Sequence, residues 1–165
     1  MRLAGVRKWT IVLVPCLLAA FCLCAPADQR DSGPEIAIVV NDSTPVSNLD
    51  MGQVRKIFLG DRQYWTPDLP VMVVVRGAGS RERDVVLRVI YQMTELEFKR
   101  YWIAKIFRAE AVSPPKIVYS DAATNELVTA VPGAIGFVAA RDVSKGEKVL
   151  RVGGHLPGDP DYVLR

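Results

Sequence analysis

The sequence has 165 residues, a formal net charge of +3 at pH 7 and three cysteines. The cysteines and the surplus positive charge both fall in the first 27 residues: 21 basic residues less Arg2, Arg7 and Lys8 leaves 18, which balances the 18 acidic residues downstream. The remainder therefore has no thiol and no net charge, which excludes a disulfide framework, a cysteine metal site and a strongly basic surface for nucleic acid. Its length suffices for one compact domain.

Residues 1–27 have the pattern of a secretory signal peptide. A basic stretch precedes a long apolar run, and the small residues at 25–27 fit a cleavage site. The alternatives are an uncleaved membrane anchor and a lipoprotein, with lipid on Cys22 or Cys24. We therefore expect an exported, periplasmic protein in which residues 28–35 form a flexible leader.

Downstream of the leader, apolar runs and turn signals predict strands that alternate with helices. We expect strands over residues 36–40, 71–75, 116–119, 134–139 and 148–152, and helices over residues 49–59, 82–92, 94–107 and 122–131. This alternation predicts a single α/β domain over residues 36–152, with a largely parallel or mixed central sheet flanked by helices. A Gly/Pro-rich tail over residues 153–165 follows it.

Local signals also predict how the helices begin and which way they face. Ser47 or Asn48 is the expected cap of the first helix, Thr94 and Glu97 form a capping box before the third, and Ser120 or Asp121 precedes the fourth. Aromatic residues recur near helical spacing in the third helix, so we expect them in the core rather than in a base-stacking platform: Phe98, Tyr101, Trp102 and Phe107.

The stretch from Val71 to Arg83 is the strongest candidate for a binding site. An unbroken apolar strand leads into Arg76, a glycine-rich turn and Ser80, where a helix should begin. The first amides of a helix lack partners and lie at the positive end of its dipole, so such a junction favours anions. The alternative is an ordinary strand-to-helix turn, with Ser80 as a simple N-cap and the arginines in solvent.

The predicted anion-binding set combines charge, amides and hydroxyl groups. Arg76 is expected to donate a bidentate hydrogen bond, Gly79 and Ser80 to supply amides and a hydroxyl, and Arg81 to add charge. Ser43 and Thr44, in the polar loop after the first strand, are expected to reach the same edge of the sheet.

Catalytic candidates are poor. His155 is the single histidine and lies in the Gly/Pro-rich tail, where a solvated loop residue is the simpler interpretation than a general base. Ser80 has no evident base partner, and no carboxylate spacing matches a known metal site. We therefore predict no catalytic residues, no cofactor and no metal.

Four short segments stand in a particular order: Val39-Val40-Asn41, Ile57-Phe58-Leu59-Gly60 followed by Trp65, Val75-Arg76 with Gly79-Ser80, and Pro132-Gly133-Ala134-Ile135-Gly136-Phe137. Together they resemble the periplasmic phosphate-binding proteins of ABC transporters over residues 36–140. The resemblance implies a type 2 periplasmic-binding-protein lobe, in which an arginine and a Gly-Ser-Gly-Thr loop hold an oxyanion. By position, Arg76 would grip the anion, and Gly79 and Ser80 would begin the cradle.

The sequence also departs from that family. Arg81 and Glu82 stand where the loop continues Gly-Thr, so a carboxylate replaces a hydroxyl donor. The chain is shorter than a two-lobed receptor and corresponds to a single-lobe form. The resemblance implies phosphate or a similar oxyanion as ligand, and an ABC transporter membrane component, or a second chain that completes the cleft, as partner. The alternative is a protein-interaction or assembly module that keeps the fold but has lost tight anion binding.

Overall fold

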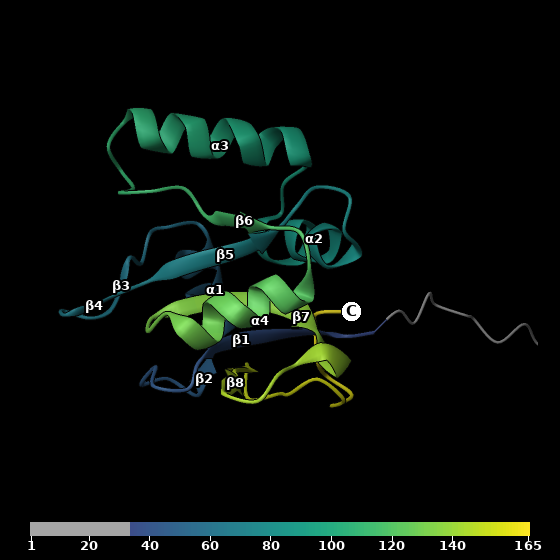
Figure 1. Ribbon diagram of the computed structural model, residues 1–165. Coiled ribbons are helices and arrows are strands. Elements are labelled where there is room, and N and C mark those ends of the chain that lie inside the picture. The colour runs from purple at the N-terminus through teal and green to yellow at the C-terminus, as the bar shows by residue number, and fades with distance from the viewer. Residues whose placement is uncertain (1–33) are drawn as a thin grey trace, which may run out of the picture. The chain divides into compact units, whose positions relative to one another are not determined.

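A mixed five-stranded sheet organises the part of the chain that the computed structural model describes, residues 34–165. The predicted signal peptide and most of the predicted leader lie outside these residues. From one side to the other, the sheet consists of β6 (Lys116–Val118), β5 (Met72–Arg76), β7 (Ala134–Ala139), β1 (Ile36–Asn41) and β8 (Glu147–Val149) (Figure 1).

Strand direction gives the sheet two distinct ends. β5 runs parallel to β6 and β7, whereas β1 runs antiparallel to β7 and β8. The carboxyl ends of β5, β6 and β7 therefore meet the start of β1 at one end, which we call the Arg76 end. The carboxyl end of β1 lies at the opposite end, which we call the Asn41 end.

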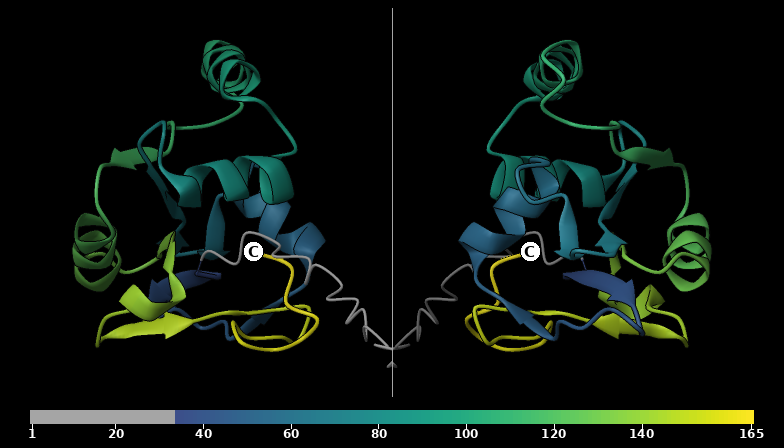
Figure 2. Two further views of the ribbon diagram at one scale, coloured as in Figure 1. Left: turned by 90° about the vertical axis from the view of Figure 1, so that its right-hand side faces the viewer. Right: turned by 90° about the vertical axis from the view of Figure 1, so that its left-hand side faces the viewer.

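Helices cover both faces of the sheet (Figure 2). α4 (Asp121–Ala130) packs on one face, against β1, β5 and β7. The other face carries α1 (Met51–Phe58), α2 (Arg81–Val86) and the π-helix η1 (Leu87–Tyr91). α3 (Glu95–Phe107) lies beyond the β6 side of the sheet (Figure 1). The predicted α/β fold with helices around a mixed sheet is therefore confirmed.

The core has two parts because the central strands are buried on both faces. Ile36, Ile38 and Val40 of β1 join a large cluster with α1, α2 and η1, whereas Ala37 and Val39 join a smaller one with Val128 of α4. Aromatic contacts attach α3 to the large cluster: the rings of Tyr91 and Phe98 meet edge to face at 4.9 Å.

Two helices differ from the sequence prediction. The first begins at Met51 with Asp50 as its N-cap, because Asn48 and Leu49 form β2 (Asn48–Leu49), which pairs with β9 (Arg151–Val152). The second divides into α2 and η1, and Gln92 ends it in a left-handed conformation with φ 55°. The capping box of Thr94 and Glu97 at α3 is confirmed.

Other predictions for the outer parts of the domain were wrong in detail. The single strand expected over residues 148–152 is divided between β8 and β9, which belong to different sheets. Residues 61–70, for which no strand was predicted, contain a small hairpin of β3 (Tyr64–Thr66) and β4 (Leu69–Pro70). Phe107 was expected in the core but is 88% exposed, as the last residue of α3.

The Gly/Pro-rich tail packs onto the start of β1. Tyr162 and Leu164 are buried, the Tyr162 hydroxyl donates to the Ile36 carbonyl at 2.5 Å, and the Ile36 amide donates to the Leu164 carbonyl at 2.9 Å. After β7, the short 3-10 helix η2 (Ala140–Asp142) begins the return towards β8. The tail therefore shares the core of the domain.

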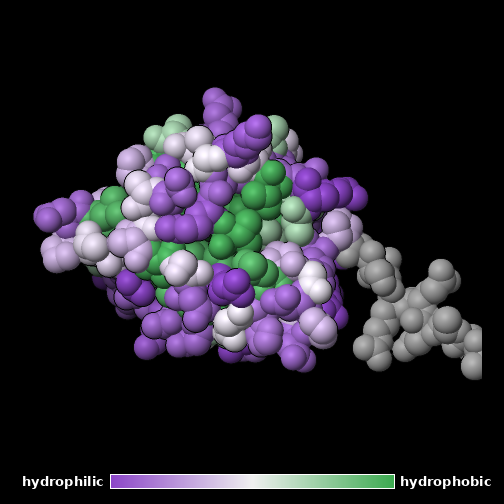
Figure 3. Space-filling model, turned by 90° about the horizontal axis from the view of Figure 1, so that it is seen from below, coloured by the Kyte–Doolittle hydropathy of each residue, from purple (hydrophilic) through white to green (hydrophobic). Residues whose placement is uncertain are grey.

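The surface mixes polar and apolar regions. The face seen from below in Figure 3 carries a patch of apolar side chains surrounded by polar ones. Within residues 34–165, no helix combines the length and the apolar character needed to cross a membrane.

Candidate functional site

The Arg76 end of the sheet holds a hollow of about 240 Å³. Its lining comes from the turn after β5 and from the residue after β6, as listed here: Arg76, Gly77, Ala78, Gly79, Ser80 and Tyr119. The two segments meet because neighbouring parallel strands finish at the same end of a sheet. The structure thus brings together Arg76, Gly79 and Ser80 from the predicted set.

The turn after β5 leaves hydrogen-bond donors free. Gly79 has φ +84°, a conformation that favours glycine, and it turns the chain into α2. Ser80 caps that helix, because its Oγ accepts a bond from the Arg83 amide at 3.3 Å. Within residues 34–165, the N–H groups of Gly79, Arg81 and Glu82 have no hydrogen-bond partner. These amides are the ones that an anion in the turn could use.

The second wall of the hollow is aromatic. A side chain at Gly77 would meet the Tyr119 ring at 2.6 Å, so the glycine allows this ring to lie directly over the turn. The Tyr119 side chain is otherwise open, with 83% of the residue exposed. Tyr119 was not among the predicted site residues.

Arg76 is paired within the protein. Its Nη1 donates to Asp121 Oδ1, and its Nη2 makes a long contact of 3.5 Å with the Tyr119 carbonyl. The side chains of Arg76 and Asp121 are 12% and 19% exposed, so the pair is partly desolvated. Burial raises the pKa of the Asp121 carboxyl above its ordinary value, and Glu82 and Asp142 raise it further, while the Arg76 guanidinium acts in the opposite direction.

Two nearby arginines have structural partners. Arg81 Nη1 donates to the Pro34 carbonyl at 2.7 Å, which ties the first turn of α2 to the start of the domain. Arg83 is buried, binds Glu95 Oε2 at 2.7 Å, and donates from Nη1 to the Arg76 carbonyl at 2.6 Å. Arg81 therefore does not line the hollow, and Arg83 holds the end of β5 in place.

Ser43 and Thr44 lie at the Asn41 end, and the structure does not bring them to the hollow. The prediction that they reach the same edge was wrong, because β1 runs antiparallel to β5 and finishes at the opposite end of the sheet. Ser43 bonds to Asn41 Oδ1 through its Oγ at 2.6 Å, and Thr44 is 1% exposed.

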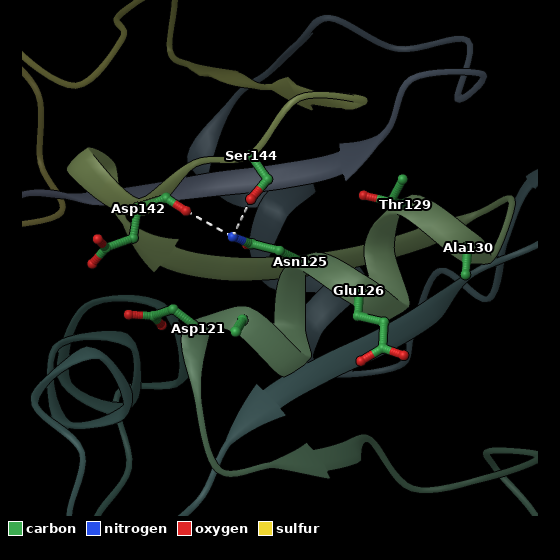
Figure 4. A pocket seen from close by; sticks show the side chains of 8 residues that line it. Asp121, Asn125, Glu126, Thr129, Ala130, Asp142 and Ser144 are labelled. Carbon is green, nitrogen blue, oxygen red and sulfur yellow. Dashed lines mark hydrogen bonds between the residues drawn. The ribbon is translucent and has the colours of Figure 1, made fainter.

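A second, larger hollow of about 730 Å³ lies over α4 (Figure 4). Carboxylates of Asp121, Glu126 and Asp142 stand around it, and Asn125 bridges its floor by donating to the Asp142 carbonyl at 2.7 Å and to Ser144 Oγ at 2.8 Å. These charges would repel an anion. Within residues 34–165, no three His, Cys, Asp or Glu side chains gather closely enough to hold a metal ion.

Asp121, like Tyr119, lies near the candidate site and was not included by sequence reasoning. It was interpreted only as a possible cap of α4, whereas Ser120 is the cap and Asp121 is the first helical residue. It lies three residues after the end of β6, and β6 is the parallel neighbour of β5. That adjacency would have identified it, but the order of strands in a sheet is not visible in a single sequence.

Known structures share this architecture. An ABC-type phosphate transport receptor from Vibrio cholerae is 25% identical, with a TM-score of 0.60 over 75% of this chain and 48% of its own. The chain resembles phosphate ABC transporter substrate-binding proteins in fold. A putative phosphate ABC transporter substrate-binding protein with bound phosphate, from Clostridium perfringens, is 22% identical, with a TM-score of 0.61 over 75% of this chain and 47% of its own.

A possible phosphate binding protein from Planctomyces limnophilus DSM 3776 also shares the fold, at lower sequence identity. It is 16% identical, with a TM-score of 0.54 over 80% of this chain and 45% of its own. The chain thus spans about half the length of the proteins it matches. No family model matches the sequence.

Proposed function

We propose that this protein is an exported, non-catalytic binding module for phosphate or a similar oxyanion. The observation that carries the proposal is the hollow at the Arg76 end, where a guanidinium, a hydroxyl and free amides surround one space. Similarity in fold to a phosphate transport receptor and to a substrate-binding protein with bound phosphate adds support. Export is inferred from the predicted signal peptide and from that similarity.

Each residue of the hollow has a chemical role in the proposal. The Arg76 guanidinium binds the anion through charge-assisted hydrogen bonds, and the Ser80 hydroxyl adds a donor while its oxygen continues to cap α2. The amides of Gly79, Arg81 and Glu82 supply further donors. Arg81 contributes long-range charge only, since its guanidinium binds Pro34.

The hollow is open to solvent on one side, which limits the affinity that this unit can reach alone. Charges in contact with water are screened, and each bond to the anion is weaker than in a dry site. A second chain that covers the hollow would remove that water. We therefore propose that the physiological partner is such a chain, or the membrane component of an ABC transporter.

Titration calorimetry of the purified protein with phosphate, and separately with sulfate, tests the proposal. We expect saturable binding that Arg76→Ala weakens by about 2 kcal/mol, or about thirtyfold in Kd. Arg76→Lys keeps the charge but loses the planar guanidinium group, so its affinity should lie between those of the unchanged protein and of Arg76→Ala. Arg151→Ala, which removes an equal charge from β9, should bind like the unchanged protein.

Circular dichroism of each variant separates a binding defect from unfolding. If the folded protein gives no heat with either anion, the proposal fails. It also fails if Arg76→Ala and Arg151→Ala weaken binding equally, because the effect would then be general charge and not the hollow.

A protein-interaction or assembly module is the second candidate, and one observation favours it. Apolar side chains are exposed around the carboxyl end of α3 and on β6: Ile103 and Ile117 are 59% and 53% exposed, and Phe107 and Val112 are each 88% exposed. Exposed apolar groups of this kind mark contact surfaces. Light scattering over a range of concentrations, with Phe107→Ser as the comparison, would detect self-association through this region, and an unchanged monomer mass would count against that form of assembly.

A further inference from the structure

Arg76 is engaged before any ligand arrives. Asp121, on the first turn of α4, accepts from Nη1, while Nη2 has only the 3.5 Å contact with the Tyr119 carbonyl. Nε is buried and has no hydrogen-bond partner within residues 34–165. Each outer nitrogen carries two N–H groups, so an oxyanion that uses both nitrogens would share Nη1 with the Asp121 carboxylate, which repels it.

We propose that Asp121 determines the affinity of the hollow by competing with the incoming anion for Arg76, and that it gives up the guanidinium as it takes up a proton. This inference rests on the function proposed above, because it requires an oxyanion to bind at Arg76. It adds a residue from a different helix to the site and couples anion binding to proton uptake.

The charges around Asp121 explain why a proton is needed. Arg76 of β5 attracts its carboxylate, whereas Glu82 of α2 and Asp142 of η2 repel it. Glu126, on the same helix, stands on the other side of the hollow over α4, into which Asp121 would turn (Figure 4). An ionised carboxylate that left Arg76 would exchange a positive neighbour for negative ones. A neutral carboxyl would not incur this repulsion.

Burial supports the same mechanism. The Asp121 side chain is 19% exposed, and its pKa is raised from 3.8, with desolvation as the largest cause. The neutral form is thus more accessible than for an aspartate in water. Anion affinity should increase as the pH falls towards the raised pKa of Asp121. Anion binding should be accompanied by the uptake of up to one proton.

Sulfate is the appropriate probe, because it remains a dianion between about pH 7 and about pH 4.5, whereas phosphate takes up a proton as the pH falls. In calorimetry near neutral pH, we expect Asp121→Asn to bind sulfate about tenfold more tightly than the unchanged protein. The control is Asp142→Asn, which also removes one carboxylate from the hollow over α4 but leaves the partner of Arg76 in place. Asp142 lies 3.5 Å from Arg141 and has no bond to Arg76, so its variant should change Kd by about twofold or less.

The pH series gives the second test. The unchanged protein should bind sulfate more tightly as the pH is lowered from about 7 to about 4.5, and this rise should be reduced in Asp121→Asn. Repeating the titration in buffers of different ionisation enthalpy measures proton uptake directly. Uptake should be present in the unchanged protein and lost in Asp121→Asn.

The outcomes separate this inference from the proposed function. If Arg76→Ala abolishes binding but Asp121→Asn binds like the unchanged protein, or no better than Asp142→Asn, the function stands and the competition does not. If binding takes up no proton, the coupling is wrong. If none of the folded variants binds sulfate or phosphate at any pH, the proposed function fails and this inference fails with it.

Discussion

The two ends of the sheet contain similar residues but use them differently. At the Asn41 end, a strand finishes in Asn41 and is followed by Ser43 and Thr44; at the Arg76 end, a strand finishes in Arg76 and is followed by Ser80. Both are polar loops after a buried strand, and the sequence suggested that both hold ligand. Within residues 34–165, a hollow bordered by free backbone amides lies at the Arg76 end.

At the Asn41 end, the side chains of Asn41 and Ser43 are hydrogen-bonded within the chain. Asn41 Nδ2 donates to the Val128 and Thr129 carbonyls, each at 2.9 Å, which satisfies two of the last carbonyls of α4. Its Oδ1 accepts from the Ser43 amide at 3.0 Å and from Ser43 Oγ at 2.6 Å. Lys148 Nζ donates to the carbonyls of Asp42 and Thr44. The hydrogen-bonding groups of Asn41 and Ser43 are thus used for structure.

The difference shows what separates a structural polar loop from a binding loop. Polar residues after a strand stabilise the fold when their donors find acceptors within the chain, as they do around Asn41. They become a candidate site when the turn leaves donors unused, as at Gly79 and Glu82. Variants at the Asn41 end should therefore change stability, whereas variants at the Arg76 end should change anion affinity.

The largest effect is expected for Asn41→Ala. Asn41 is 8% exposed, and its removal leaves two helix carbonyls and the Ser43 amide without their partner. We expect the free energy of unfolding to fall by about 3 kcal/mol, measured by urea denaturation. Anion affinity of the folded fraction should be unchanged.

Ser43→Ala is the control for that variant. Ser43 is exposed and contributes one side-chain bond, to Asn41, so its loss should cost about 1 kcal/mol or less. A large loss of anion affinity in either variant would contradict the separation of the two ends, because it would return the Asn41 end to the site.

Ser80→Ala is expected to have a smaller effect on stability than Asn41→Ala and, in addition, to weaken anion binding. Loss of the N-cap of α2 should lower the free energy of unfolding by about 1 kcal/mol. Loss of the hydroxyl from the hollow should also weaken anion binding in calorimetry. Thr94→Ala removes a hydroxyl cap from α3, away from the hollow, and should lower stability without changing affinity. Equal affinities for the two variants would remove the Ser80 side chain from the proposed site.

Sequence reasoning was most successful where the signals are local. The strand before Arg76, the glycine turn and the cap at Ser80 are fixed by residues within a few positions of one another, and the structure reproduces them. The capping box of Thr94 and Glu97 is local in the same way. Their success follows from short-range hydrogen bonds and steric preferences that need no knowledge of the rest of the chain.

The misplaced residues depend on long-range pairing instead. Ser43 and Thr44 were assigned to the Arg76 end because a largely parallel sheet was assumed, but the direction of β1 is set by its pairing with β7, almost a hundred residues later. Asp121 was missed because its partner Arg76 lies 45 residues earlier. Asn48 was expected to cap α1 but pairs instead with Arg151 of β9. Such contacts depend on the fold as a whole.

Thr44→Val should have a small effect of the opposite sign. Thr44 is 1% exposed, and its Oγ1 is buried with no hydrogen-bond partner within residues 34–165. Replacing the hydroxyl with a methyl group of similar size should raise the free energy of unfolding by about 0.5 kcal/mol. Thr44→Ser keeps the hydroxyl, loses the methyl group and should be less stable than the unchanged protein. If Thr44→Val were clearly destabilised, the Thr44 hydroxyl would have a hydrogen-bond partner, and its burial would not carry the expected cost.

The smallest effect is expected in the pH dependence of stability at the Arg76 end. The pKa of Asp121 is raised in the folded protein, so the folded state holds this proton at pH values where the unfolded chain has released it. Its contribution therefore favours folding at low pH and is lost as the pH rises from about 3.8 through the raised value. Because solvent reaches part of this side chain, the change will be modest.

Urea denaturation of the unchanged protein and of Asp121→Asn, compared at each pH, isolates the contribution of Asp121. The stability of the unchanged protein relative to the variant should decline with rising pH. A relative stability that increased with pH would mean that the ion pair with Arg76 outweighs desolvation, and that Asp121 holds the guanidinium more firmly than the proposed competition allows.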